Sequence, residues 1–324
     1  MTRVYITIDT EYSAGMARRL GRDCRKANFA ASIAGETGSG AAGIAYQMDR
    51  FDRHGLKAVF FVDPMPALLW GVEAVTDVVG PIVARGHDVQ LHLHTEWLEL
   101  AGPDNPLPGR TGLNLKDFNL DEQCRLLDLA RDRLVRAGAP RPTAFRAGNY
   151  GANDDTLRAL ARLGLTHDTS HAPGIAGSHC AIGLGAGDRH PVRREGVTEV
   201  PIGCIAGRSP SLRHAQLTAL SAGEMLAAIS HARGRGEAGF TLVSHSFELL
   251  SRDRSRINQV VRRRFDTLCR ALGRMPGVST GTYVANPPVA EPPAGEQPIL
   301  PHSPLLTGLR LAEQVLANAL YGSK

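Results

Sequence analysis

The sequence predicts an α/β protein, a distorted (β/α) barrel of about seven to eight largely parallel strands. Short apolar runs rich in β-branched and aromatic residues alternate along the chain with longer segments of helical period, as in a parallel sheet covered by helices. The length of 324 residues leaves room for one barrel, because barrels of roughly 200–250 residues commonly fold as a single domain. A hydrophobic fraction of 43% with 21% charged residues is that of a globular protein and excludes global disorder.

The elements follow one another in a regular order along the chain. Strands are expected at eight short β-rich runs, namely Val4–Ile8, Ala58–Val62, Asp88–His92, Ala144–Arg146, Thr166–Asp168, Thr198–Pro201, Phe240–Ser244 and Val278–Thr280. Helices are expected at six segments of helical period, namely Gly43–His54, Ala74–Arg85, Leu120–Ala137, Asp154–Leu163, Ser221–Arg233 and Asn258–Leu272.

Start and stop signals support two of these helices. Asn153 can cap the helix that begins at Asp154, and Gly164 follows its last turn, where glycine is favoured. Ser221 and Glu224 have the S-x-x-E spacing of a capping box.

Other stretches are expected to lack regular structure. Ser13–Gly43 is rich in Gly, Ala and Ser, and Pro103–Lys116 is rich in Pro and Gly. Loops of this length near strand ends often shape a substrate site. By composition, we expect a barrel domain over residues 1–285, an extended Pro-rich linker over 286–303, and a C-terminal region over 304–324 with an amphipathic helix at Leu305–Leu320.

Composition argues against membrane-spanning, disulfide-rich and nucleic-acid-binding proteins. No apolar stretch approaches the ~18 residues of a membrane-spanning helix, and no export signal precedes the strand at Val4–Ile8, so a cytoplasmic location is expected. The five cysteines are scattered and never spaced as C-x-x-C, which argues against a disulfide framework and a Cys-based zinc site. The net charge of +5 comes from arginines spread along helices, with one compact cluster at 262–264, so no nucleic-acid partner is expected.

The first run of chemically active residues follows the first strand. Asp9 and Glu11 come two positions apart at its end, and side chains that far apart on an extended segment project to the same side. The alternative is that both carboxylates cap a neighbouring loop or helix.

The second run is His92, His94 and Glu96. The two histidines alternate with Leu91 and Leu93, so they share one face if the strand continues to His94. Neutral imidazoles are common zinc ligands, and a catalytic zinc usually has three protein ligands. This H-x-H-x-E pattern beside an acidic strand end therefore predicts a metal site.

Two further strand ends carry polar side chains. Arg146 precedes a Gly-rich turn, and an arginine there can hold a carboxylate through two hydrogen bonds. A phosphate cradle at this turn is disfavoured, because Asp154 and Asp155 in the next helix would repel phosphate. His245 ends another apolar strand. The alternative interpretation is that His245 only lies beside a serine that caps a helix. Asp168 ends a further strand and could orient His245 or Arg146.

In a barrel the carboxyl ends of the strands meet at one mouth, so these strand ends should converge. Taken together, the motifs resemble the polysaccharide deacetylase family, also called the NodB-homology domain or carbohydrate esterase family 4. The resemblance spans roughly residues 3–285. The family motif T-F-D-D is similar to 7–10, G-H-E-x-x-x-H-x-x-x-H to 86–96, R-x-P-x-G to 146–151, and L-x-x-H to 242–245.

The chain departs from these motifs at three positions, so it looks like a divergent member. Thr10 stands where the family has a metal-binding Asp, Glu96 where it has its second histidine, and Gly148 where it has proline. The resemblance implies a distorted barrel and a divalent metal, most commonly Zn²⁺.

The resemblance also implies roles for individual residues. Asp9 would be the general base, poised by Arg146, and His245 the general acid. Glu11 and His92 would hold the metal together with either His94 or Glu96.

The expected function is a metal-dependent hydrolase that removes an N-acyl group, in most members N-acetyl, from a sugar or a glycan precursor in polysaccharide biosynthesis. An alternative is a carbohydrate-binding barrel that has lost its metal and its catalysis. A third possibility is hydrolysis of another C–N bond.

Overall fold

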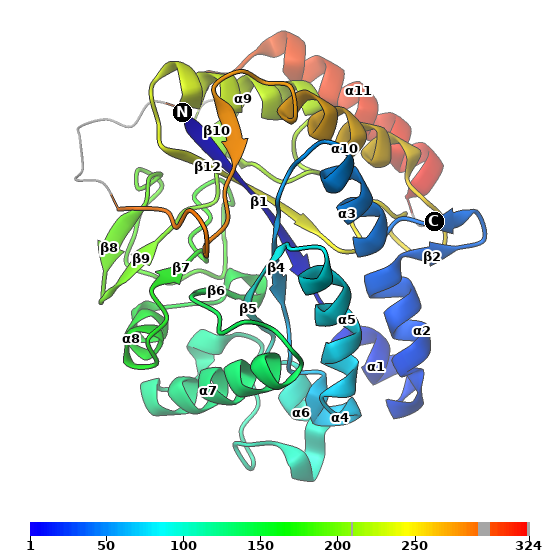
Figure 1. The fold of residues 1–324 in the computed structure, drawn as a ribbon, viewed down its shortest axis with the longest axis vertical. Coiled ribbons are helices and arrows are strands. Elements are labelled where there is room, and N and C mark those ends of the chain that lie inside the picture. The colour runs from blue at the N-terminus through cyan, green and yellow to red at the C-terminus, as the bar shows by residue number, and fades with distance from the viewer. Residues whose placement is uncertain (209, 291–298, 323–324) are drawn as a thin grey trace.

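In the computed structural model, which describes residues 1–208, 210–290 and 299–322, strand β1 (Thr2–Thr10) runs through the middle of the molecule (Figure 1). Eight of its nine residues are buried. β1 pairs in parallel with β12 on one side and with β4 on the other, and its first residues also pair with β13. The carboxyl end of β1 is thereby enclosed by strands that run the same way.

Within the described residues the main sheet has nine strands, in the order β12-β1-β4-β5-β6-β7-β9-β8, with β13 paired to β1. The other strands are β4 (Val59–Val62), β5 (Asp88–Leu93), β6 (Ala144–Ala147), β7 (His167–Asp168), β8 (Val192–Arg194), β9 (Val197–Glu199), β12 (Gly239–His245) and β13 (Val278–Thr280). All pairs are parallel except β8 with β9. The predicted distorted barrel is confirmed, with one antiparallel edge strand added.

The barrel closes between β9 and β12 through irregular backbone rather than through a strand ladder. The amide of Gly203 donates to the carbonyl of Thr241 at 3.0 Å, and the amide of Val243 donates to the carbonyl of Ala215 at 2.9 Å. The amide of Leu217 donates to the carbonyl of Val243 at 3.1 Å. We call this set of contacts the closure seam.

Helices surround the sheet (Figure 1). The longer ones are α3 (Ile44–Arg53), α5 (Glu73–Ala84), α7 (Leu120–Arg136), α8 (Asp154–Arg162), α9 (Ala222–Gly234), α10 (Gln259–Leu272) and α11 (Pro304–Tyr321). The six helices predicted within the barrel all form, with each end shifted by at most one residue. The caps also form as predicted: Asn153 accepts from the amide of Thr156, and Ser221 and Glu224 make a reciprocal capping box.

The prediction of an irregular segment at Ser13–Gly43 is wrong. It folds into α1 (Ala14–Leu20), α2 (Arg25–Phe29), a π-helical turn at Ala30–Ala34, and a small hairpin of β2 (Glu36–Thr37) and β3 (Gly40–Ala41). Ser13 caps α1, and the buried side chain of Asn28 bonds both the amide and the carbonyl of Ser13. These short-range polar contacts stabilise helices that hydrophobic periodicity does not reveal.

The remaining elements are short. They are α4 (Ala67–Trp70), α6 (Trp97–Ala101), β10 (Cys204–Ala206), β11 (Leu212–His214), and 3₁₀ turns at Arg22–Cys24, Gly102–Asp104, Leu115–Asp117 and Gly148–Tyr150. The stretch Pro103–Lys116 is otherwise irregular, as expected.

Helix α11 occupies the place where the sequence predicts a C-terminal amphipathic helix, and it packs on α9 and α10. Much of the predicted linker over 286–303, namely 291–298, lies outside the described residues. None of the described helices is both long enough and apolar enough to cross a membrane. All five cysteines are unpaired.

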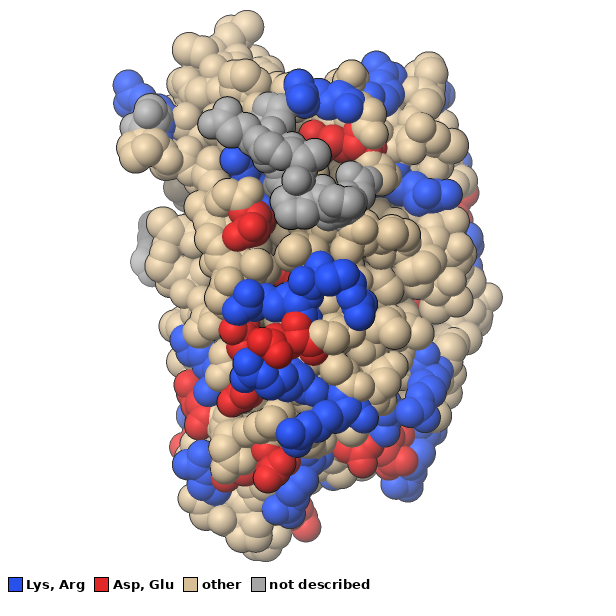
Figure 2. Space-filling view, turned by 90° about the vertical axis from the view of Figure 1, so that its left-hand side faces the viewer, with Lys and Arg blue, Asp and Glu red and all other residues tan. Residues whose placement is uncertain are grey.

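The side of the barrel that carries α8 and β8 faces the viewer in Figure 2, where basic and acidic side chains are interspersed. Arg158 pairs with Asp155 and Glu195, and Arg194 pairs with Asp154. The arginines on this side are therefore balanced by acids.

Candidate active site

Asp9 lies at the centre of the barrel mouth, between Arg146 and His245. The strand register brings them there, because Asp9 pairs across the sheet with His245. The Oδ1 atom of Asp9 accepts a hydrogen bond of 2.6 Å from Nη1 of Arg146, and Oδ2 lies 4.0 Å from Nε2 of His245. Three strand ends far apart in sequence thus meet at one buried carboxylate.

Arg146 is completely buried, so its charge must be compensated inside the protein. Its Nη1 binds Asp9, its Nε donates to the carbonyl of Thr169 at 3.2 Å, and its guanidinium lies 4.5 Å from the ring centroid of Phe61. Burial would lower the pKa of Arg146, but the charge and hydrogen bond of Asp9, together with Tyr150 and Tyr283, outweigh burial and raise this pKa. Arg146 is therefore a permanent cation beneath Asp9.

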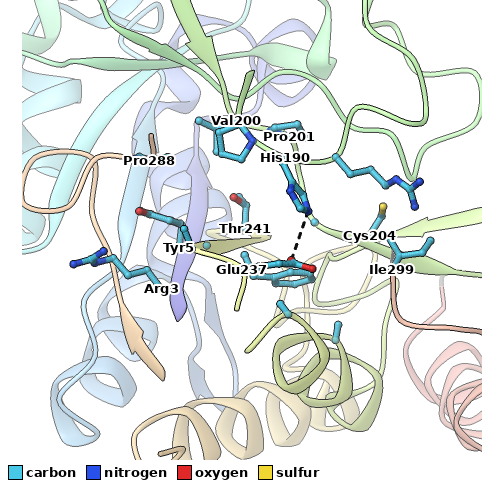
Figure 3. Close-up of a pocket in the computed structure, with 18 of the residues that line it drawn as sticks. Arg3, Tyr5, His190, Val200, Pro201, Cys204, Glu237, Thr241, Pro288 and Ile299 are labelled. Carbon is cyan, nitrogen blue, oxygen red and sulfur yellow. Dashed lines mark ion pairs between the residues drawn. The ribbon is translucent and has the colours of Figure 1, made fainter. Parts of the chain in front are cut away.

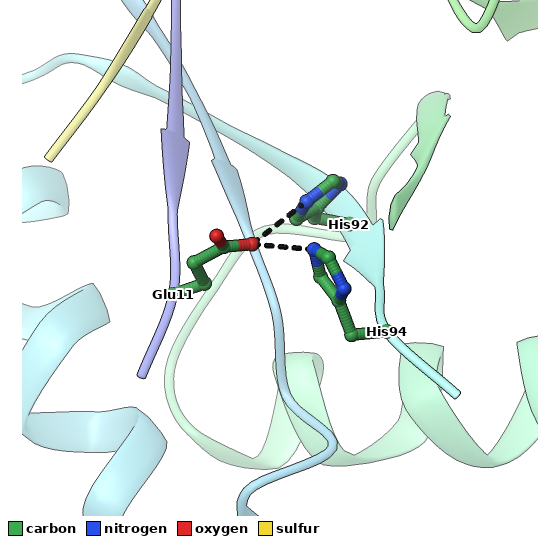
Figure 4. A group of neighbouring side chains, drawn as sticks. All are labelled: Glu11, His92 and His94. Carbon is green, nitrogen blue, oxygen red and sulfur yellow. Dashed lines mark hydrogen bonds and ion pairs between the residues drawn. The ribbon is translucent and has the colours of Figure 1, made fainter. Parts of the chain in front are cut away.

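A second cluster, of Glu11, His92 and His94, is drawn in Figure 4, and His92 contacts the backbone of Arg146 from the first. The Oε2 atom of Glu11 is 3.2 Å from Nε2 of His92 and 2.6 Å from Nε2 of His94. One ligand atom from each of the three side chains lies within 4.8 Å of the other two. The extended segments after Thr10 and around His92 place these groups on the inner side of the mouth, as the period-two spacing predicts.

The opposite nitrogen of each imidazole has its own partner. Nδ1 of His92 bonds the backbone carbonyl of Arg146 at 2.7 Å, and Nδ1 of His94 bonds Oε2 of Glu96 at 3.0 Å. Metal-binding histidines commonly use the second nitrogen in this way, because that contact fixes the ring and directs the free nitrogen at the metal. The donor set of one carboxylate and two imidazoles fits a divalent cation such as Zn²⁺.

Charge in this cluster is strongly coupled. Burial would raise the pKa of Glu11, but the charges and hydrogen bonds of His94 and His92 hold it well below its ordinary value. Burial would lower the pKa of His94, but Glu11 and Glu96 raise it well above its ordinary value. Glu11 and Glu96 therefore stabilise positive charge at this point.

The geometry bears on the choice between His94 and Glu96. His94 belongs to the cluster with Glu11 and His92, whereas Glu96 lies behind His94 and contacts its far nitrogen. Gly148 makes room for this arrangement, since a Cβ atom there would lie 2.7 Å from the His94 ring.

His245 has a second acidic neighbour that the sequence reasoning missed. Glu248, buried and three residues later, accepts from the amide of His245 at 2.9 Å and lies 3.4 Å from its Nδ1. Burial would lower the pKa of His245, but the hydrogen bond and charge of Glu248, with the charges of Asp9 and Glu11, raise it to about 9. Thr218 and Gln216 in turn donate to Glu248 and hold it in place. His245 is thus protonated at neutral pH.

Asp168 lies below the mouth. Its carboxylate accepts from the amide of Ser170 at 3.0 Å and from its hydroxyl at 2.9 Å, and that hydroxyl accepts from the amide of Ala147. Its other neighbour is the fully buried Glu199, a second residue the sequence reasoning missed. Arg146 donates its hydrogen bonds to Asp9 and Thr169 instead.

Asp63 is a third residue that was missed. It directly follows β4, is buried, and accepts from the amide of Met65 and from Nε1 of Trp97 at 2.9 Å. Burial raises the pKa of Asp63 to about 6, although the charges of His94 and His92 oppose this. The sequence does offer a signal, because Val59–Val62 is an apolar strand that ends in an acid, as the first strand does.

A cavity at the opposite end of the barrel is lined by the first residues of β1 and β12, among them Arg3, Tyr5 and Thr241 (Figure 3). His190 and Glu237 form an ion pair of 3.8 Å in its wall. Arg3 and Asp9 are six strand residues apart, about 20 Å. This cavity is therefore separate from the candidate site.

Solved structures share this fold. A protein provisionally described as a polysaccharide deacetylase, from Mycobacterium smegmatis, has a TM-score of 0.54 at 14% identity, over 90% of this chain and 94% of that chain. A protein from Pseudomonas aeruginosa PAO1 with a similar provisional description has a TM-score of 0.53 at 10% identity, over 88% of this chain and 92% of that chain. The 4-alpha-glucanotransferase from Thermococcus litoralis has a TM-score of 0.53 at 10% identity, over 88% of this chain but 40% of that chain.

No protein-family model matches the sequence, and no curated protein matches it. The structural similarity confirms the barrel that the sequence motifs imply. Because proteins with different named activities share this barrel, function has to be argued from the site.

Proposed function

We propose that this protein is a metal-dependent hydrolase that removes an N-acyl group from a sugar or a glycan precursor, with N-acetyl as the preferred assignment. One observation carries the proposal: Arg146 joins the two clusters. Its side chain binds Asp9, and its backbone carbonyl binds His92. The Asp9 carboxylate and the Glu11–His92–His94 cluster are thereby fixed relative to each other, and strand pairing holds His245 beside Asp9, as amide hydrolysis requires.

Asp9 and His245 supply the proton transfers. Arg146 occupies Oδ1 of Asp9, which leaves Oδ2 facing His245 and free to take a proton from the attacking water. His245 is the protonated partner and can deliver its Nε2 proton to the amide nitrogen as the C–N bond breaks. An amine leaves poorly without that proton, and each such transfer contributes about 10²–10⁴-fold in rate.

Glu11, His92 and His94 would hold the metal, for which Zn²⁺ is our first choice. A divalent metal there would polarise the acyl carbonyl and stabilise the charge that develops on its oxygen. Glu96 and the carbonyl of Arg146 keep the two imidazoles oriented.

The test is acetate release by zinc-loaded protein from N-acetylated nucleotide sugars and from chitin oligomers. Asp9→Asn should lower the rate at least 100-fold while zinc remains bound. Asp49→Asn, at an exposed acid on α3, is the matched control and should have no effect. Undiminished activity in Asp9→Asn would remove Asp9 as the base.

The non-catalytic alternative predicts a different result. Thr10 and Glu96, at positions where the resembled family has ligands, motivate that alternative, but His94 supplies a third side chain in their place. Zinc analysis of protein purified without added metal decides the matter. The enzyme is supported if the protein contains stoichiometric zinc, loses it in His92→Ala, and releases acetate. The alternative is supported if the protein is free of zinc and binds sugar without cleaving it.

A further inference from the structure

Helix α11 presents an apolar face to solvent. Of the large hydrophobic side chains that are exposed among the described residues, six belong to this one helix, namely Leu305, Leu309, Leu311, Val315, Leu316 and Leu320. Leu305 is 73% exposed and Val315 is 69% exposed. Single exposed hydrophobic residues are ordinary, but a contiguous group marks an interaction site.

Both charged residues of α11 pair with residues of the barrel. The described helix contains two, Arg310 and Glu313. Arg310 is buried, with Nε 3.4 Å from Glu224 of α9, and Glu313 accepts a hydrogen bond of 2.7 Å from Arg264 of α10. The helix is thus anchored to the barrel by ion pairs and turns its leucines outward, the reverse of an ordinary surface helix.

Four of the exposed leucines form a stripe that follows one face of α11, on which Glu313 also lies, held by Arg264. Leu305, Leu309, Leu316 and Leu320 recur at spacings of four, seven and four, which keeps them on one face of a helix. Eighteen residues make a helix about 27 Å long, so the stripe extends along about 22 Å. This length suits a helix that lies along a surface.

Basic residues lie near the C-terminal end of the stripe, and we call them its basic border. At the end of α11, the guanidinium of Arg256 lies 5.6 Å from the ring centroid of Tyr321, and the amide of Arg252 donates to the carbonyl of Tyr321. Arg263 is exposed on α10, next to the Arg264 that anchors Glu313. The acid of this region, Asp253, has its carboxylate bound by Ser251 and Ser255.

We propose that α11 and its basic border dock on the surface of an anionic lipid bilayer. An apolar helical stripe can enter the boundary between headgroups and acyl chains, while neighbouring arginines bind anionic headgroups. A second copy of the chain would offer the same positive border and not an opposite charge. The positive border therefore favours lipid over a second copy.

The experiment uses the full chain and co-sedimentation with two kinds of vesicle, phosphatidylcholine alone and phosphatidylcholine with phosphatidylglycerol at 3:1. We expect binding to the anionic vesicles and little to the neutral ones. Leu309→Glu with Leu316→Glu should weaken this binding at least tenfold, and Arg252→Gln with Arg256→Gln should weaken it several-fold. All these positions are exposed and remote from the candidate site, so the melting temperature and acetate release should not change.

The matched control is Val83→Glu with Val135→Glu, which adds the same two charges at exposed valines on α5 and α7. In Figure 1, α7 lies at the opposite end of the molecule from α11. Equal binding by the α11 double variant and this control would overturn the proposal, as would absence of binding by the unaltered chain. A concentration-dependent dimer in sedimentation velocity, abolished by the leucine variants and accompanied by no vesicle binding, would assign the face to a second copy instead.

Discussion

Gly148 lies directly against the imidazole of His94. A methyl group on Gly148 would fall 2.7 Å from Cγ and Nδ1 of that ring and 2.8 Å from Cε1, closer than real contacts allow. The proline that the resembled family carries at this place would meet the same ring. The histidine at 94 therefore depends on the glycine at 148, since the ring needs the space that this glycine leaves.

Gly148→Ala should therefore displace His94 and weaken metal binding. We expect at least a tenfold loss of zinc affinity, within the range caused by disturbing groups that orient metal ligands. Competition with a chromogenic chelator measures it. Gly187→Ala is the control, because no atom lies within 4 Å of its added Cβ. Equal affinities for the two variants would show that His94 does not need this space.

Replacement of His94 and of Glu96 should have different consequences. His94→Ala removes a member of the cluster and should abolish stoichiometric zinc binding. Glu96→Gln keeps a hydrogen-bonding group beside Nδ1 and should reduce affinity by about 10–100-fold. Zinc titration monitored by calorimetry compares them. If His94→Ala bound zinc normally while Glu96→Gln did not, the ligand assignment would be reversed.

Glu248→Gln should shift the pH dependence of turnover. The Glu248 carboxylate helps to raise the pKa of His245 to about 9, because a negative charge favours the imidazolium. Removal of that charge lowers this pKa, so the protonated acid is lost at lower pH. The alkaline limb of kcat should move down by about 1–3 pH units, with the rate at low pH retained. Glu99→Gln, at an exposed surface pair with Arg18, should leave the profile unchanged.

Glu199→Gln should stabilise the protein at neutral and alkaline pH. Burial, together with the charge and hydrogen bond of Asp168, raises the pKa of Glu199 well above 4.5. The folded state then holds a proton that the unfolded state releases, so stability falls as pH rises from about 4.5 toward the raised folded-state pKa. Glutamine donates to Asp168 without that dependence. Thermal melts should show a gain of several degrees at pH 8 that disappears near pH 4, and a uniform loss at all pH values would contradict this explanation.

Much of the site could be predicted from sequence because strand ends carry it. In a parallel barrel the carboxyl ends of the strands meet, so Asp9, Arg146 and His245 could be brought together from the positions of three apolar runs. Period-two alternation also placed His92 and His94 on one face. Local periodicity is strong in these segments, and the parallel topology then brings their ends together.

The residues that were missed depend on contacts that local pattern does not encode. Glu199 matters because Asp168 lies beside it across the sheet, and Glu248 matters because the turn after β12 folds its carboxylate back onto His245. Each is an ordinary acid in the sequence. The helices within Ser13–Gly43 were missed for a related reason, since the side-chain contacts of Ser13 and Asn28 stabilise a segment with little hydrophobic period.

The closure seam is the part of the barrel wall that we expect to open most easily. Between β1 and β12 seven consecutive residue pairs are in register, whereas individual bonds at Gly203, Ala215 and Leu217 close the wall on the other side of β12. Fluctuations that part the wall therefore begin at the seam, and its amides should exchange with solvent deuterium well before those of β1. Because His245 stands two residues beyond Val243, every such opening should loosen this proposed proton donor first, so the strength of this one join would set how long Asp9 and His245 stay aligned.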